Sequence, residues 1–274
     1  MNTWRASGSG RCPRRRENKK TSNAQRPTPN AEFKDHFSAH AADYAKFRPR
    51  YPSELFGYLG SIAPATNLAW DCATGSGQAA VDLAEVFSRV IATDASEKQI
   101  ANAERHPRVE YRVAAAEKSG LEAASVDLIM VAQALHWFDL DRFYAEARRV
   151  LKPRGLLAAT AYKLATVSPE IDAIVNEYYS DIVGPYWPAE RVLVEKFEEL
   201  RFEFPELETP RFAMAVEWDM EQLLGYLRTW SATQRFMAAE NRDPLEKTEN
   251  ELRRVWGDDR RRVVWPLTVR VGRL

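Results

Sequence analysis

Hydrophobic residues follow two alternating patterns along most of the chain. Short apolar runs, typical of buried strands, occur at residues 67–73, 89–94, 108–114, 125–135 and 156–162. Between them apolar residues fall three or four positions apart, which predicts helices at residues 77–87, 96–106 and 140–155. Strands that alternate with helices of this length predict an α/β fold, with a doubly wound, mostly parallel sheet covered on both faces.

The pattern changes after Tyr162. Helices predicted at 171–179 and 190–200 precede a strand at 211–218, and helices at 220–230 and 243–257 precede a last strand at 262–272. The two late strands are candidates for an antiparallel pair at the sheet edge, so we expect a Rossmann-like sheet of seven strands with an antiparallel last strand. We expect residues 166–205 to form a small helical cap over the open edge, within one domain spanning residues 32–274.

The N-terminal segment has neither pattern. Residues 1–31 are rich in Ser, Gly, Pro, Asn and Arg, and the first thirty carry eight basic residues against one acidic residue. This composition predicts a disordered basic tail, and it also permits an organelle transit peptide. Helices are predicted at Phe33–Lys46 and Ser53–Leu59, on either side of the turn "FRPRYP".

Composition narrows the classes of partner. The 39 basic and 39 acidic residues balance, so the chain beyond the basic tail is mildly acidic and is not expected to bind nucleic acid. The two cysteines, Cys12 and Cys72, exclude a disulfide framework and favour a reducing compartment such as the cytoplasm. No apolar run approaches the roughly 20 residues of a membrane span. We expect a monomer or homodimer without a metal or a membrane partner.

The stretch "WDCATGSGQ" joins the first predicted strand of the sheet to its helix. Ligands of open parallel sheets bind beyond the carboxyl ends of the strands, where the strand order reverses. Gly75 and Gly77 can adopt backbone angles that other residues avoid, and the helix start offers unpaired N–H groups. Asp94 ends the second strand, where a carboxylate can accept hydrogen bonds from ribose hydroxyls. These residues predict a nucleoside site.

Asp71 indicates which nucleoside. A dinucleotide site has three glycines and holds a pyrophosphate, which the carboxylate of Asp71 would repel, and Ala80 stands where the third glycine would be. S-adenosylmethionine carries an ammonium and a sulfonium and no phosphate, so it fits better. An NAD-dependent oxidoreductase is the alternative from another class.

The motifs "DCATGSG", "IATD", "VAAAE", "SVDLIMVAQALHWFD" and "RRVLKPRG" follow one another along the chain. In this order they resemble the class I S-adenosylmethionine-dependent methyltransferases, and in particular the type 11 small-molecule group. The segment "AQALHWFD", with "FRPRYP" before it and "YLRTWSA" after it, resembles the branch that contains fungal trans-aconitate methyltransferases and related plant proteins. The resemblance implies methyl transfer from S-adenosylmethionine to a small molecule, through a carboxylate or a hydroxyl.

The resemblance also implies roles for single residues. Ala73, Gly75 and Gly77 would surround the methionine part and ribose of the cofactor, with Asp71 orienting their loop. The remaining cofactor contacts would come from Asp94 at the ribose, Ala116 and Glu117 at the adenine, Gln133 near the methyl group, and Tyr44 and Arg48 on the N-terminal segment. Arg48 can pair with the methionine carboxylate or cap a helix. Many relatives have glycine in place of Ala73 and aspartate in place of Ala115, so a protein that binds the cofactor without turnover is a second alternative.

Four further residues are candidates for the acceptor side. His136 can take a proton from a hydroxyl acceptor, or hydrogen-bond to a neighbouring loop. Trp137 can stack on the substrate or pack under its own loop. Arg228 can anchor an acidic substrate, and Trp230 can wall the substrate pocket or belong to the core. A carboxylate acceptor is already ionised at neutral pH and needs no general base.

Overall fold

The computed structural model describes residue 47 and residues 49–274, all of which belong to one unit of the chain that begins at Phe33. The predicted tail at 1–31, the helix predicted at 33–46, Tyr44 and Arg48 therefore lie outside the described residues. Among the described residues no helix is both long enough and apolar enough to cross a membrane.

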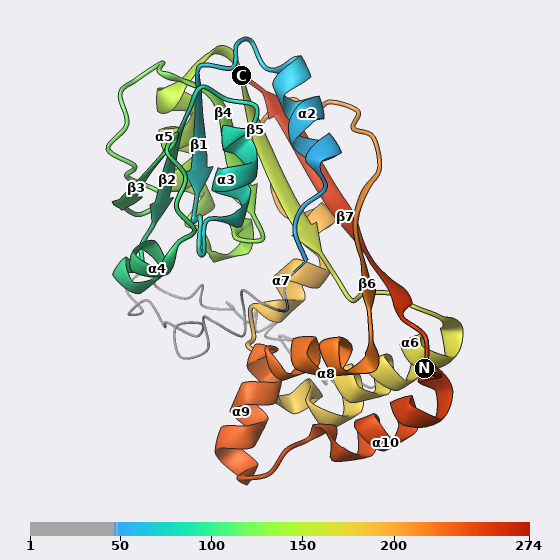
Figure 1. Cartoon of the computed structure of the whole chain (residues 1–274). Coiled ribbons are helices and arrows are strands. Elements are labelled where there is room, and N and C mark those ends of the chain that lie inside the picture. Colours follow the sequence, from blue (N-terminus) through green and yellow to red (C-terminus); the bar gives the residue numbers. More distant parts are fainter. Residues whose placement is uncertain (1–46, 48) are drawn as a thin grey trace, which may run out of the picture. The chain divides into compact units, whose positions relative to one another are not determined.

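A single mixed sheet dominates residues 49–274 (Figure 1), with seven strands in the order β3-β2-β1-β4-β5-β7-β6. The strands are β1 (Leu68–Cys72), β2 (Arg89–Asp94), β3 (Val109–Val113), β4 (Val126–Ala132), β5 (Leu151–Tyr162), β6 (Phe212–Trp218) and β7 (Arg261–Arg273). The first five run parallel, whereas β7 is antiparallel to both β5 and β6. The expected doubly wound sheet with an antiparallel last strand is confirmed.

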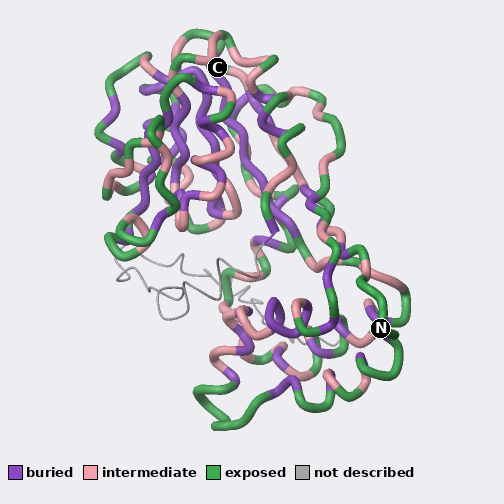
Figure 2. Tube along the Cα trace, in the orientation of Figure 1, coloured by how far each residue is buried: buried purple, intermediate pink, exposed green. Residues whose placement is uncertain are grey.

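Helices cover both faces of this sheet because its strands present apolar side chains in both directions. Ala69, Leu128 and Met130 pack into a core with α2 (Ser53–Ile62) and α3 (Gln78–Ala84). Trp70 and Ile129 point the opposite way, into a core with α5 (Leu140–Val150). The short helix α4 (Glu97–Asn102) joins β2 to β3. Figure 2 shows the central strands buried along most of their length.

The helix before β5 is shorter than predicted. It was expected to reach Gly155, but α5 ends at Val150 and β5 begins at Leu151. Pro153 explains the difference, because proline lacks an N–H and disfavours helical angles at the residue before it. Arg154 then takes a left-handed conformation (φ 66°), in the stretch where the pairing of β5 with β4 shifts in register.

A second group of helices follows β5 in the sequence, and we call it the helical layer. It comprises α6 (Pro169–Glu177), η3 (Tyr178–Ile182), η4 (Gly184–Tyr186), α8 (Met220–Arg228), α9 (Ser231–Glu240) and α10 (Leu245–Trp256). These helices pack on one another: α10 contacts both α6 and α8, and α9 contacts both η4 and α8. The layer therefore draws on more of the chain than the segment 166–205 (Figure 1).

The end of that segment belongs with the sheet instead. The helices α7 (Arg191–Glu195) and η5 (Phe197–Glu199) follow the first half of the helical layer. Phe197 is fully buried in the core beneath α5. Lys163, which directly follows β5, lies 3.6 Å from Glu198, so this segment lies beside the carboxyl end of β5.

Candidate functional site

The loop after β1 lies at the carboxyl edge of the parallel strands, where the order reverses between β2 and β4. Three of its residues have positive φ angles: 58° at Ala73, 55° at Gly75 and 82° at Gly77. Ala73 thus adopts the left-handed conformation that glycine adopts most easily, at a cost of about 1–2 kcal/mol. The loop backbone therefore has the conformation that a glycine at position 73 would allow, although the residue is alanine.

Asp94 is held directly against this loop. Its Oδ2 accepts a hydrogen bond from the Gly75 N–H at 2.9 Å, and its Oδ1 accepts one from the Ser96 N–H at 2.8 Å. The Thr74 N–H donates to the backbone oxygen of Thr93 at 2.8 Å, so the loop and β2 are linked on both sides of the carboxylate. The structure therefore brings together the glycine turn and the acid at the end of β2.

Asp71 lies under the loop and is fully buried. Its Oδ2 accepts a hydrogen bond from the Thr74 hydroxyl, whereas Oδ1 has no hydrogen-bond partner among the described residues. Burial raises the pKa of Asp71 to about 7, against the opposing effect of the Thr74 hydrogen bond. Beside it, a Cβ atom on Gly77 would lie 2.5 Å from the Tyr111 hydroxyl, so the loop tolerates no larger residue there without movement.

The loop after β3 carries Ala116 and Glu117, the predicted adenine contacts. Glu117 accepts a hydrogen bond from the Asp139 N–H at 3.0 Å, which ties this loop to the start of α5. Glu146 on α5 accepts from both the N–H and the hydroxyl of Ser119, at 2.9 and 2.6 Å. Hydrogen bonds from Arg149 lower the pKa of Glu146 to about 2, so the carboxylate that fixes the loop stays ionised.

The loop after β4 carries Gln133, His136 and Trp137. The Gln133 amide pairs with the backbone of Tyr162 in both directions, at 3.0 and 3.1 Å, and so links β4 to the end of β5. The Nδ1 atom of His136 is buried and has no partner among the described residues. Burial first, and then the charge of Arg191, lower the pKa of His136 to about 4. The Trp137 ring lies 4.8 Å from the imidazole and remains 45% exposed.

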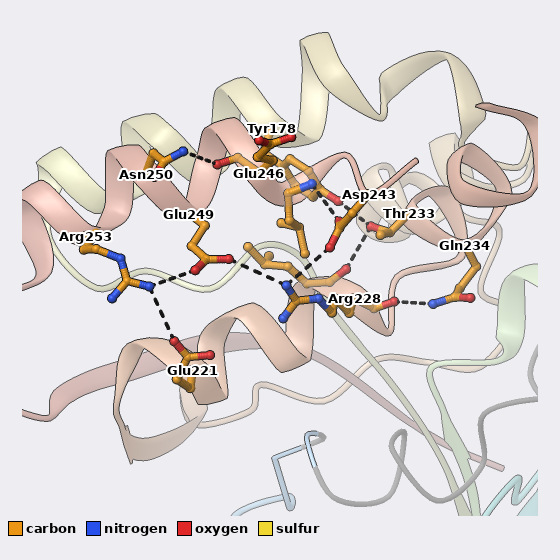
Figure 3. A network of polar contacts seen from close by, with 12 residues as sticks. Tyr178, Glu221, Arg228, Thr233, Gln234, Asp243, Glu246, Glu249, Asn250 and Arg253 are labelled. Carbon is orange, nitrogen blue, oxygen red and sulfur yellow. Dashed lines mark hydrogen bonds and ion pairs between the residues drawn. The ribbon is translucent and has the colours of Figure 1, made fainter. Parts of the chain in front are cut away.

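Arg228 and Trp230 lie in the helical layer. The Arg228 guanidinium lies 3.4 Å from Asp243 and 3.7 Å from Glu249, between α8 and α10 (Figure 3). The guanidinium is thus already engaged by two acidic side chains, and its role as an anchor for an acidic substrate stays a prediction. Trp230 is only 4% exposed and packs against Tyr178, Tyr179 and Trp187, so it belongs to the core of the layer.

Sequence reasoning missed three residues near the carboxyl edge: Tyr179, Trp187 and Arg191. The Arg191 guanidinium lies over both rings, 4.8 Å from the centroid of Trp187 and 5.4 Å from that of Tyr179. No local motif marks them, because they come from η3, from the residue after η4, and from α7. Within the described ranges no group of three or more His, Cys, Asp or Glu side chains could hold a metal ion.

Comparison with known proteins agrees with this geometry. Residues 70–159 match the model of a family described as "Methyltransferase domain". A proposed methyltransferase of Dictyostelium discoideum is 38% identical over 231 residues, covering 82% of this chain and 88% of that protein. The chain belongs to the class I S-adenosylmethionine-dependent methyltransferases.

A solved structure supports the same assignment for this methyltransferase. A proposed type II methyltransferase from Anaeromyxobacter dehalogenans is 50% identical, with a TM-score of 0.79, over 82% of this chain and 97% of that one. A protein of Mycobacterium tuberculosis, itself proposed to be an S-adenosylmethionine-dependent methyltransferase, is 36% identical over 108 residues, 39% of each chain. These relatives do not confirm the predicted trans-aconitate branch, so the methyltransferase is assigned to the family alone.

Proposed function

We propose that this methyltransferase binds S-adenosylmethionine at the loop after β1 and transfers a methyl group to a carboxylate or hydroxyl oxygen of a small molecule. The observation that carries the proposal is the Asp94 carboxylate, held by two backbone N–H groups beside the Gly75 turn. A carboxylate at this position of a doubly wound sheet suits the hydroxyls of a ribose.

The chain's own residues fit the cofactor. Asp94 would hold the ribose, and Ala116 and Glu117 would lie near the adenine on a loop fixed by Glu146. The buried Asp71, whose Oδ1 has no hydrogen-bond partner among the described residues, would face the cationic methionine part. It would do so beside Gly77, where Tyr111 leaves no room for a side chain. When bound, the cofactor supplies a methyl group already activated by a positively charged sulfur. The protein then needs chiefly to align the acceptor oxygen and exclude water.

The test is calorimetric titration of the full chain with S-adenosylhomocysteine and, separately, with NADH. We expect saturable binding of S-adenosylhomocysteine only, and a loss of about 10- to 100-fold in affinity for Asp94→Ala, because a charged acceptor is removed. Asp258→Ala, at an exposed acid without a described contact, is the matched control. Binding of NADH alone would favour the oxidoreductase alternative and overturn the proposal.

Transfer of tritium from labelled S-adenosylmethionine to a small-molecule extract then separates turnover from binding. His136→Ala indicates the acceptor type, because a hydroxyl acceptor needs a general base to take its proton whereas a carboxylate does not. Burial lowers the pKa of His136 to about 4, so at neutral pH the imidazole is unprotonated and can accept a proton. If the acceptor is a carboxylate, we expect the rate to fall less than about tenfold. A hydroxyl acceptor that needs the base would lose about 10²- to 10⁴-fold. Cofactor binding without any transfer would instead support the alternative of a protein without turnover.

A further inference from the structure

The segment around Arg191 lies at the same edge of the sheet as the cofactor loops. Ala132, at the end of β4, pairs with Thr160 on β5, and Gln133 hydrogen-bonds to Tyr162. The ion pair between Lys163 and Glu198 places the segment after α7 beside the end of β5. The electrostatic effect of Arg191 on His136 agrees with this placement.

Arg191 is oriented rigidly but is not neutralised. Its Nε donates a hydrogen bond to the Tyr179 hydroxyl at 2.9 Å, and that hydroxyl donates in turn to Glu195. The Trp187 indole is fixed by a 3.2 Å hydrogen bond to the backbone oxygen of Tyr179. Neither Nη atom of Arg191 has a hydrogen bond or an ion pair with any described residue. The N–H groups of both Nη atoms are therefore available to a ligand, while stacking on the two rings sets the plane of the guanidinium.

The Nδ1 atom of His136, which is buried and has no partner among the described residues, lies close enough to Arg191 to feel its charge. Planar guanidinium groups bind carboxylates through two parallel hydrogen bonds. We infer that Arg191, stacked on Tyr179 and Trp187, binds a carboxylate of the methyl acceptor and so selects anionic small molecules. The inference rests on the proposed function and names its substrate class. Arg191 differs from Arg228 in that the guanidinium of Arg228 is paired with Asp243 and Glu249.

The test uses the full chain, tritiated S-adenosylmethionine and two fractions of a small-molecule yeast extract: one retained by an anion exchanger at pH 7 and one that flows through. We expect transfer to the retained fraction. Arg191→Gln should reduce kcat/KM for that fraction by about 10- to 100-fold, mainly through KM, because a charge-assisted pair is lost. Arg191→Lys keeps the charge without the planar fork and should lose less than Arg191→Gln.

Arg211→Gln is the matched control, because Arg211 is exposed and makes no described side-chain contact. S-adenosylhomocysteine affinity should be the same in Arg191→Gln and the control. The melting temperature of Arg191→Gln should be lower by a few degrees, because its hydrogen bond to Tyr179 and its stacking on Trp187 are lost. Transfer to the flow-through fraction alone, or equal rates for the two Gln variants, would overturn the subsite while the proposed function stands. Failure to bind S-adenosylhomocysteine, or to methylate either fraction, would overturn the proposed function and the subsite with it.

Discussion

Asp71 shows how the position of one side chain changes its chemistry. The unfolded chain releases the proton of this carboxyl near pH 4, whereas burial keeps it in the folded chain up to about pH 7. The folded state therefore binds more protons between these pH values, and its stability falls as the pH rises through them. Below pH 4 Asp71 is protonated in both the folded and the unfolded chain, and its full contribution to the stability of the folded state is present.

Asp71→Asn removes this titrating group, so the stability of the variant should fall less as the pH rises. Relative to the variant, we expect the wild type to lose about 3 kcal/mol of unfolding free energy between pH 4.5 and pH 8. Urea unfolding of both proteins at the two pH values measures the difference. If wild type and variant change in parallel with pH, Asp71 is already ionised in the folded protein.

Gly77 is the second position at which a single residue controls the site. Its φ of 82° and the nearby Tyr111 hydroxyl both oppose a side chain. Gly77→Ala should cost about 1–2 kcal/mol from the left-handed conformation alone, with a further cost from the contact with Tyr111. Adding Tyr111→Phe should recover only part of the contact cost, because two ring atoms stay 3.2 Å from the added Cβ and the hydrogen bond from Tyr111 to Glu104 is lost.

Thermal unfolding of the single and double variants separates these two contributions for Gly77. A double variant as unstable as Gly77→Ala would show that the tyrosine moves aside without cost. We also expect S-adenosylhomocysteine affinity to fall with Gly77→Ala, because Gly77 belongs to the loop that would contact the cofactor.

At the scale of elements, Arg270 on β7 fixes the segment that follows α7. Its guanidinium bonds to both carboxylate oxygens of Glu206, at 2.6 and 3.0 Å, and to the backbone oxygens of Phe197 and Leu200. It also lies 4.6 Å above the Phe202 ring. One side chain thus joins the irregular segment 197–206 to a regular strand.

Arg270→Met should release that segment and destabilise the protein by roughly 2–3 kcal/mol, because several charge-assisted hydrogen bonds are lost. Arg262→Met, on the same strand but exposed and without a described contact, is the control. Urea unfolding gives the free energy, and hydrogen exchange should become faster within residues 197–206. Equal exchange in both variants would mean that packing alone holds the segment.

At the scale of the whole molecule, β7 is last in the described chain but lies between β5 and β6 in the sheet. Leu156 pairs with Arg273, so residues far apart in sequence must meet before the sheet is complete. A Cβ atom on Gly272 would lie 2.4 Å from the Cβ of Phe204, which leaves no room at this junction.

Gly272→Ala should therefore destabilise the whole domain by about 1–3 kcal/mol, the usual cost of overpacking. Gly57→Ala is the control, because an added Cβ on that exposed helical residue meets nothing within 4 Å and should stabilise by about 0.5–1 kcal/mol. Melting temperatures that shift in opposite directions support the prediction. A neutral Gly272→Ala would show that Phe202 and Phe204 can move away.

Local patterns in the sequence were sufficient for the parallel part of the sheet and for the position of the loop after β1. Apolar periodicity is a property of neighbouring residues, so it located β1 to β5 and their helices, and "DCATGSG" and "IATD" lie at strand ends whose positions follow from parallel pairing. Pro153 could also have predicted that α5 ends at Val150. The helix was predicted too long because the apolar spacing typical of a helix continues beyond that residue.

Contacts between distant segments were decided by the tertiary structure alone. The extent of the helical layer, the pairing of Arg228 with Asp243 and Glu249, and the stacking of Arg191 on Tyr179 and Trp187 join parts of the chain that share no local pattern. The same is true of the pKa values of Asp71 and His136, which depend on burial. A sequence motif specifies the chemistry of a side chain, whereas packing decides which partners and how much water it meets.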